Sequence, residues 1–192
     1  MKTASELKED ISFKATLRGE KLRYVSTWGL FSPKGIDDGS YLLIKHIDMT
    51  DGQRTLDLGC GYGAMGLAIA KAYPKGSVHL VDKDFVGIEY ASKNVQLNGL
   101  DNCKVYLSNG LGAVGDEKFD NIIANLPANV GNEMLYIMLS DAHAHLNPGG
   151  QMVVVTIAGL KEFIKRNFKE IFGNYQKIKQ GRDHTVARAL RE

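Results

Sequence analysis

The chain has 192 residues, of which 44% are hydrophobic and 24% charged, which is the composition of an ordinary soluble globular protein. Its formal net charge of +2 gives no argument by itself for a nucleic acid or a membrane as partner. Two cysteines, and five histidines without metal-ligand spacing, exclude a disulfide framework and a Cys-rich zinc site. The sequence therefore predicts a reduced, cytoplasmic protein without a metal, a secretory signal or a membrane span.

Residues 11–31 alternate between polar and apolar and break at Gly19, which predicts a short hairpin of residues 12–17 and 21–25. Pro33 and Gly35 mark a loop, and residues 41–47 have the pattern of a short helix. From there, strand and helix patterns alternate. The predicted strands are residues 54–58, 77–82, 103–108, 119–124 and 151–156, and the predicted helices are residues 64–73, 85–98, 132–145 and 159–172.

Two last strands, residues 174–179 and 184–190, are separated by a polar turn and predict an antiparallel hairpin. The predicted fold class is therefore α/β: a Rossmann-like, mostly parallel seven-stranded sheet with helices on both faces and a C-terminal antiparallel hairpin. Residues 1–30 are predicted to be an N-terminal hairpin extension, and residues 31–192 a single domain. Ligands of such folds bind beyond the carboxyl ends of the strands, so the site is expected just after residues 58, 82, 108 and 124.

Glycine is in excess, at 21 residues of 192 against a usual share of about 7%. Four of these glycines follow the first strand of the sheet, at positions 59, 61, 63 and 66. They allow a ligand to approach backbone N–H groups at the start of a helix. A tight turn without a ligand is one alternative. Another is a dinucleotide site, because Gly61, Gly63 and Gly66 satisfy the G-x-G-x-x-G pattern and Asp82 follows 19 residues after Gly63.

Two acidic residues favour a different ligand. Asp57 lies near the end of a strand that should be buried, and a buried carboxylate needs a partner that an ammonium group supplies and a pyrophosphate does not. Asp82 can accept hydrogen bonds from both hydroxyls of a ribose, although it could also be a helix cap or a solvent-facing acid. A cationic amino acid moiety near the glycines and a ribose at Asp82 describe S-adenosylmethionine better than NAD.

Motifs over nearly the whole chain add to this interpretation. They are residues 29–40, the glycine loop 56–66, Asp82, residues 91–100, residues 108–109, residues 119–127 and the turn 146–150. With these motifs the sequence resembles the class I S-adenosylmethionine-dependent methyltransferases. More narrowly, it is similar to the small-domain group that contains the small-subunit ribosomal RNA guanine-N2 methyltransferases and their single-domain archaeal relatives.

The resemblance implies a set of cofactor-binding residues. The backbone of Gly59, Cys60, Gly61 and Gly63 would line the methionine and ribose, with Asp57 beneath the amino group and Asp82 on the ribose. Lys83 would lie along the adenine, and Asn109 and Gly110 would contact it. Phe31, Ser32 and the segment Asp37 to Gly39 would close over the methionine end, with Asn125 beside them.

The resemblance also implies two catalytic residues, Asn125 and Pro127. The family has Asn-Pro-Pro and an aromatic here, because an exocyclic amine is a poor nucleophile whose lone pair is delocalised. The Asn125 oxygen and the backbone carbonyl after it would accept both N–H groups and turn the lone pair toward the methyl group, so that transfer needs mainly alignment.

This chain departs from that motif at two positions. Leu126 replaces the first proline, and Ala128 replaces the aromatic that would stack on a flipped base. Phe31, Trp28 and Tyr136 are candidates for a substituting ring. The same tetrapeptide could also be a strand-ending turn in a cofactor-binding homologue with little catalysis.

The implied partner is RNA, with a guanine N2 in ribosomal RNA as methyl acceptor and a monomer or homodimer as the working unit. Residues 161–192 carry nine Lys and Arg against four acids, whereas residues 110–147 carry five acids and one lysine. The basic end could be a solvated helix face. Lys14, Arg18, Lys21 and Arg23 make the N-terminal hairpin the first place to expect RNA contacts. A protein glutamine or a small amine is the alternative acceptor, and a nicotinamide enzyme is the alternative class.

Overall fold

The computed structural model describes residues 3–128 and 130–192. Its strands are β1 (Ile11–Leu17), β2 (Glu20–Ser26), β3 (Arg54–Leu58), β4 (Ser77–Asp82), β5 (Cys103–Leu107), β6 (Phe119–Asn125), β7 (Leu146–Ile157), β8 (Gln176–Gln180) and β9 (His184–Leu190). Its helices are α1 (Ala4–Leu7), α2 (Asp38–His46), α3 (Ala64–Ala72), α4 (Phe85–Leu97), α5 (Asn132–His145) and α6 (Lys161–Phe172), the last preceded by a 3₁₀ turn, η1 (Ala158–Leu160).

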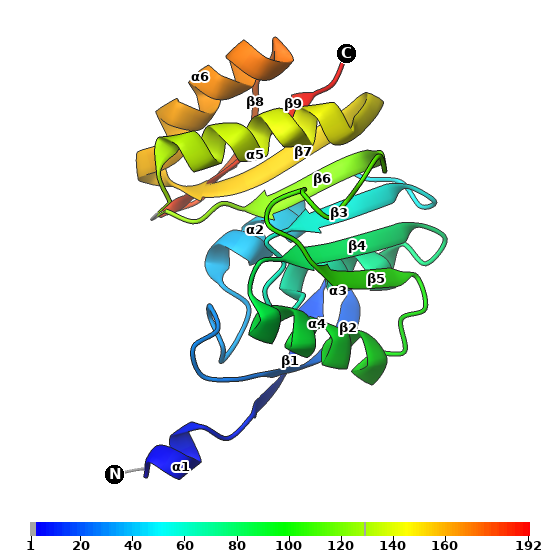
Figure 1. Ribbon diagram of the computed structural model, residues 1–192, viewed down its shortest axis with the longest axis vertical. Helices are drawn as coiled ribbons and strands as arrows, with labels where there is room; N and C mark the ends of the chain where they lie inside the picture. The colour runs from blue at the N-terminus through cyan, green and yellow to red at the C-terminus, as the bar shows by residue number, and fades with distance from the viewer. Residues whose placement is uncertain (1–2, 129) are drawn as a thin grey trace.

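The centre of the molecule is a sheet of seven strands in the order β5-β4-β3-β6-β7-β9-β8 (Figure 1). Strands β3 to β7 are parallel, and β9 runs antiparallel to both β7 and β8. A separate antiparallel pair, β1 and β2, precedes this sheet. The predicted α/β fold with a mostly parallel seven-stranded sheet and a hairpin at each end of the chain is therefore confirmed.

Two predicted boundaries differ in an informative way. Residues 146–150, expected as a turn, belong to β7: Leu146 pairs with Phe119 and Gln151 with Asn121, so residues 147–150 bulge opposite one residue of β6. Gly150 fits this bulge because a Cβ there would lie 3.1 Å or less from three backbone oxygens. The helix expected at 41–47 begins earlier, at Asp38, because the Asp37 side chain caps its N-terminus.

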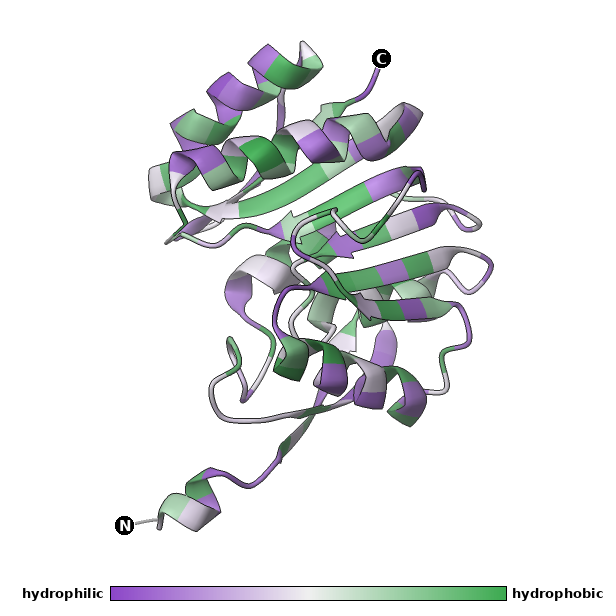
Figure 2. Cartoon of the chain, in the orientation of Figure 1, coloured by the Kyte–Doolittle hydropathy of each residue, from purple (hydrophilic) through white to green (hydrophobic). Residues whose placement is uncertain are grey.

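Helices cover both faces of the sheet, and side chains of successive strand residues point to opposite faces. Ile123 and Val153 pack with α2, α3 and α4, whereas Ile122 and Met152 pack with α5 and α6. Figure 2 shows the hydrophobic residues along the central strands and the mixed polarity of the helices that cover them. No helix within residues 3–128 and 130–192 combines the length and the hydrophobicity needed to cross a bilayer.

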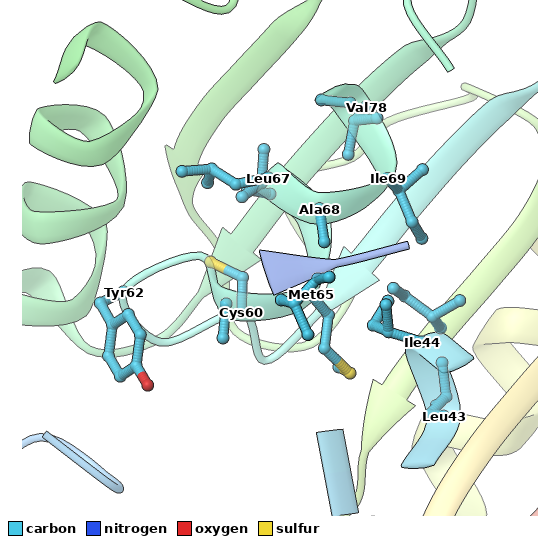
Figure 3. Close-up of a cluster of buried hydrophobic side chains, with 14 of the residues drawn as sticks. Leu43, Ile44, Cys60, Tyr62, Met65, Leu67, Ala68, Ile69 and Val78 are labelled. Atoms are coloured by element: carbon cyan, nitrogen blue, oxygen red, sulfur yellow. The ribbon is translucent and has the colours of Figure 1, made fainter. Parts of the chain in front are cut away.

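The N-terminal hairpin packs into the core on the α3 and α4 side. Leu17, Leu22 and Tyr24 are almost fully buried in the same cluster as α3. Figure 3 shows Met65 of α3 beside Leu43 and Ile44 of α2 in this cluster, with Tyr62 on the opposite side of the view. The hairpin therefore shares a core with the sheet that follows it.

Candidate active site

A cavity of about 510 Å³ opens at the carboxyl ends of the parallel strands, where the sequence predicted the site. Eleven of the predicted site residues line it: Phe31, Asp37, Gly59, Cys60, Gly61, Asp82, Lys83, Asn109, Gly110, Asn125 and Pro127. Four others, Ser32, Gly39, Asp57 and Gly63, lie outside the cavity wall. Some wall residues follow β3, β4 and β5, and others follow β6. The strand order brings all of them to one edge of the sheet.

The glycine loop forms one side of the cavity and is held by the backbone and one carboxylate. The N–H groups of Gly59 and Cys60 donate to the Val81 carbonyl at 2.9 and 3.0 Å. The Gly61 N–H donates to Asp82 Oδ2 at 2.8 Å, and the Asp84 N–H donates to Asp82 Oδ1 at 2.9 Å. Both oxygens of Asp82 are thereby fixed at the mouth of the loop, and each retains a lone pair for a further donor.

Two glycines of the loop are required by packing, not by the cavity. Gly63 caps helix α3 in the left-handed conformation, with φ of 90°, and a Cβ there would collide with the Leu67 side chain. A Cβ on Gly66 would lie 2.7 Å from Leu80 Cδ2 and 3.0 Å from Asp57 Oδ2. These positions bring α3 close to β3 and β4, so the helix N-terminus faces the cavity.

Asp57 is fully buried beneath the loop. Its Oδ2 accepts the Gly66 N–H at 2.7 Å, and its Oδ1 has no hydrogen-bond partner among the residues that the structure describes. Burial raises the pKa of this carboxyl to about 7, against the opposing effect of the Gly66 hydrogen bond and with a further increase from the charge of Asp82. The cavity thus has an incompletely satisfied carboxylate directly under its glycine loop.

Asn125 forms the other polar end of the cavity. Its side-chain Nδ2 donates to Asp37 Oδ1 at 3.0 Å and to Ser40 Oγ at 3.1 Å. Both acceptors belong to the start of helix α2, which is 85 or more residues away along the chain. No hydrogen bond from the described residues reaches Asn125 Oδ1, so this end of the cavity presents a free amide acceptor.

The structure gives a reason for Leu126 in place of a proline. The Leu126 N–H donates to the Val155 carbonyl at 3.0 Å and extends the pairing of β6 with β7 by one hydrogen bond. A proline has no N–H for that bond. The Leu126 side chain is also buried in the core cluster beneath the cavity.

The segment before α2 is held over the cavity by a tyrosine of the glycine loop. The Tyr62 hydroxyl donates to the carbonyls of Ser32 at 3.1 Å and Gly35 at 3.0 Å. Burial, with a smaller contribution from the charge of Asp37, raises the pKa of Tyr62 far above its ordinary value, so this hydroxyl stays protonated. Ser32 therefore anchors the segment through its backbone, while Phe31, which is 72% exposed, reaches the cavity.

Several wall residues were not predicted from the sequence. They are mostly apolar: Ser40, Tyr62, Val130, Met134, Met138, Ile157 and His184. His184 begins β9 and pairs with Ile157 at the end of β7. Because β9 is antiparallel to β7, the start of β9 must lie at the carboxyl edge of the sheet. The predicted last hairpin therefore carries a signal for His184, because the first residue of its second strand lies at the ligand edge.

Gly39 brings His184 next to the start of helix α2. A Cβ on Gly39 would lie 3.0 Å from both Asp37 Oδ1 and His184 Cδ2. The carboxylate and the imidazole therefore flank the same glycine, which contributes to the site through its small size. Of the three rings considered as a substitute for the aromatic missing at Ala128, Phe31 lines the cavity, whereas Trp28 and Tyr136 do not.

The basic residues of the predicted RNA-contacting hairpin have two different roles. Arg18 donates to the carbonyls of Ile44 and Ile47 at 2.9 Å, and Arg23 donates to the Leu97 carbonyl at 2.7 Å. These two guanidinium groups connect the hairpin to helices α2 and α4. Lys14 and Lys21 are exposed. No cluster of three or more His, Cys, Asp or Glu suited to a metal exists in the described part of the chain.

The sequence model of the methyltransferase small domain family matches residues 21–188. Among curated proteins, YbxB of Bacillus subtilis is 30% identical over 141 residues, which cover 72% of this chain and 70% of YbxB. Ribosomal RNA small subunit methyltransferase C of Hahella chejuensis is 34% identical over 131 residues, which cover 66% of this chain and 38% of that protein.

Among solved structures, the T. thermophilus 16S rRNA N2 G1207 methyltransferase RsmC, in complex with AdoMet and guanosine, matches with a TM-score of 0.87 and 27% identity. That match covers 95% of this chain and 51% of RsmC. This chain therefore spans about half the length, or less, of these two ribosomal RNA methyltransferases. The strands β3 to β7, whose carboxyl ends carry the cavity, all lie within the residues matched by the family.

Proposed function

The chain belongs to the methyltransferase small domain family, and from this membership we propose that it transfers the methyl group of S-adenosylmethionine to N2 of a guanine in ribosomal RNA. The observation that carries the proposal is the match to RsmC over 95% of this chain, since that structure contains both AdoMet and guanosine. The cavity supports it with two polar ends, at Asp82 and at Asn125, joined by an apolar wall.

The residues of the glycine-loop side fit S-adenosylmethionine. The cavity volume of about 510 Å³ lies within the range of small-molecule sites. Asp82 has lone pairs left for the ribose hydroxyls, and Gly59 and Gly61 leave open space where a side chain would project. The buried Asp57 carboxylate, with Oδ1 unpartnered, suits a cationic amino group above the loop. Lys83, Asn109 and Gly110 would then hold the adenine.

Asn125 and its neighbour would hold the acceptor amine. S-adenosylmethionine supplies an electrophilic methyl group on a positively charged sulfur. Asn125 Oδ1 and the Leu126 carbonyl accept the two N–H groups of the amine, which directs its lone pair toward the methyl group. The same two oxygens would stabilise the positive charge that the nitrogen gains as the N–C bond forms and the bond between the methyl group and sulfur breaks. S-adenosylhomocysteine would leave, and the methylated nitrogen would lose one proton to solvent. Pro127 restricts the backbone after these acceptors, so that their alignment is retained.

The wall around Asn125 suits a flat heterocycle. Phe31 and His184 contribute rings, and Met134, Met138 and Ile157 contribute apolar surface. Because Ala128 contributes no ring, we assign base stacking to Phe31, which is the candidate ring that lies in the wall.

RNA docking is proposed for the exposed cations and not for all basic residues. Lys14 and Lys21 of the hairpin are exposed, and β8 adds the exposed Lys177 and Lys179. These side chains would bind phosphates, with a salt-dependent affinity. The working unit, a monomer or homodimer, and the division into an extension of residues 1–30 and a methyltransferase domain of residues 31–192 are part of the same proposal.

The test is the destination of the methyl group. The protein is incubated with methyl-labelled S-adenosylmethionine and ribosomal RNA or ribosomal subunits that lack the modification, and the RNA and protein fractions are counted separately. Nucleoside analysis of the RNA is expected to give N2-methylguanosine, and an Asp82→Ala control is expected to give none. Label in the protein fraction alone would assign the activity to a protein side chain. Thermal stabilisation by NAD but not by S-adenosylmethionine would reject the cofactor.

A further inference from the structure

The orientation of the Asn125 side-chain amide decides what this residue can do. An amide has a carbonyl oxygen that accepts hydrogen bonds at one end and an NH₂ group that donates at the other. Only the oxygen can hold the N–H groups of an acceptor amine. With the opposite orientation, NH₂ would face NH₂ and the amine would be repelled. The reaction proposed above therefore requires something that fixes which end of Asn125 faces the cavity.

Both hydrogens of the Asn125 NH₂ group are already used within the protein. Nδ2 donates to Asp37 Oδ1 at 3.0 Å and to Ser40 Oγ at 3.1 Å. A carboxylate can only accept hydrogen bonds, so Asp37 can pair with the NH₂ end of Asn125 and not with its oxygen. A flipped amide would place two acceptor oxygens about 3 Å apart in a half-buried position, which is unfavourable.

Asp37 is itself held in place by helix α2. Its Oδ1 also accepts the Ser40 N–H at 3.0 Å, which makes it the N-cap residue of the helix. The N-terminus of the helix, with its unpaired backbone N–H groups, suits an acceptor side chain at this position. Gly39 leaves room for it, since a Cβ on Gly39 would lie 3.0 Å from Asp37 Oδ1.

We infer that Asp37 is a positioning residue, whose carboxylate holds the Asn125 amide with Oδ1 facing the methyl acceptor. The resemblance implied a different role, in which the segment from Asp37 to Gly39 closes over the methionine end of the cofactor. The inference rests on the proposed methyl transfer to an amine, and it separates the cofactor-binding and acceptor-binding functions at this residue. Asp37 acts on the reaction through Asn125.

Three variants test the role of Asp37. Asp37→Ser keeps a good N-cap for α2 but is too short to reach Asn125. Asp37→Asn keeps an acceptor oxygen at the position of Oδ1, because the Ser40 N–H, which donates to that atom at 3.0 Å, holds the new amide with its oxygen toward Asn125. Asp38→Ser is the matched control, because it removes the exposed neighbouring carboxylate. At saturating S-adenosylmethionine we expect Asp37→Ser to lower kcat by about 10²-fold, as for other losses of alignment. Asp37→Asn should retain most of that rate, and the cofactor Kd, measured by calorimetry, should change less than threefold in either variant.

A spectroscopic measurement tests the same contact without any reaction. In a ¹⁵N correlation spectrum of the ligand-free protein, the Asn125 side-chain NH₂ signals are assigned by their absence in Asn125→Ala. They should shift in Asp37→Ser and stay close to their wild-type positions in Asp37→Asn and Asp38→Ser. Unchanged signals in Asp37→Ser would overturn the inference, as would a weakened cofactor Kd with an unchanged kcat. Failure of the wild type to methylate RNA would instead reject the proposed function, since the NH₂ signals do not depend on it.

Discussion

The two halves of the cavity are built in different ways. The proposed cofactor half consists mostly of residues at the ends of β3, β4 and β5 or directly after them, and its glycine loop is one continuous segment. The proposed acceptor half is assembled from the loop before α2, the end of β6, helix α5, the end of β7 and the start of β9. The cofactor always has the same shape, so a pocket for it can be built from residues that lie close together in the sequence. Recognition of the acceptor depends on side chains that only the complete fold brings together.

Because of this difference, substitutions in the two halves should change different measured properties. Changes in the cofactor half alter the packing of α3 on the sheet, because Gly63 and Gly66 are in contact with core side chains. Changes in the acceptor half alter wall side chains with exposed surface, such as Phe31 and Ile157. Stability and cofactor affinity should therefore follow the first half, and turnover and acceptor affinity the second.

The largest effect is expected for Asn125→Ala. It removes the acceptor oxygen of the acceptor half, and we expect kcat to fall by about 10³-fold, the upper range for loss of one preorganised hydrogen-bonding group. The cofactor Kd should change by less than fivefold. Steady-state methylation and calorimetry measure the two quantities. An equal loss in both would show that the two halves are not separable at Asn125.

A pH-dependent stability difference is expected for Asp57→Asn. The pKa of Asp57 is about 7 in the folded protein, and it is close to 4 in an unfolded chain. Protonation therefore stabilises the folded state fully below about pH 4, and this contribution is lost as the pH rises to about 7. The unfolding free energy of the wild type should fall relative to Asp57→Asn across that window, by about 3 kcal/mol. Urea unfolding of both proteins from pH 4.5 to 8 measures this change. A difference in unfolding free energy that stays constant over this range would contradict the raised pKa of Asp57.

A smaller loss of stability is expected for Gly63→Ala. The alanine must adopt φ of 90° and also displaces the Leu67 side chain, so we expect the unfolding free energy to fall by about 2 kcal/mol. Gly52→Ala is the matched control, because Gly52 also has φ of 90° but has open space around it. Urea unfolding should show the smaller loss in Gly52→Ala. Equal losses would mean that strain acts alone and that crowding by Leu67 contributes nothing.

The smallest effect is expected for His184→Ala. His184 lines the acceptor half, and loss of one contact of this kind is expected to raise the KM for RNA about threefold to tenfold. The cofactor Kd should not change. His46→Ala, which removes an imidazole outside the cavity wall, is the control. A change in the cofactor Kd for His184→Ala would show that His184 contributes to the cofactor half.

The fold could be predicted because its signals are local. Strand and helix patterns alternate, caps such as Asp84 and stops such as Gly173 lie at the expected ends, and parallel strands then determine where the ligand edge is. The bulge at residues 147–150 was missed, because its pairing depends on Arg191, whose N–H and carbonyl bond to Gly150 and Gly149. That contact joins residues about 40 positions apart.

The candidate site could be predicted only in part, for the same reason. The glycine loop follows β3 directly and Asp82 ends β4, so a sequence pattern is sufficient to find them. The contact between Asp37 and Asn125 joins residues 88 positions apart, and no periodicity within either segment shows it. The reason for Leu126 is likewise visible only once Val155 is beside it.

Helix α2 has a mechanical consequence for the site. At its C-terminal end Arg18 of the hairpin binds the carbonyls of Ile44 and Ile47, and at its N-terminal end Asp37 and Ser40 bind Asn125. A nine-residue helix spans only about 13 Å, and a span of this length is stiff. The N-terminal hairpin therefore supports the Asn125 amide from a distance. Loosening of the hairpin would release this end of α2, and it would also disturb the glycine loop, because the Tyr24 hydroxyl donates to the Ala64 carbonyl at 3.1 Å and the Tyr24 ring packs against Tyr62.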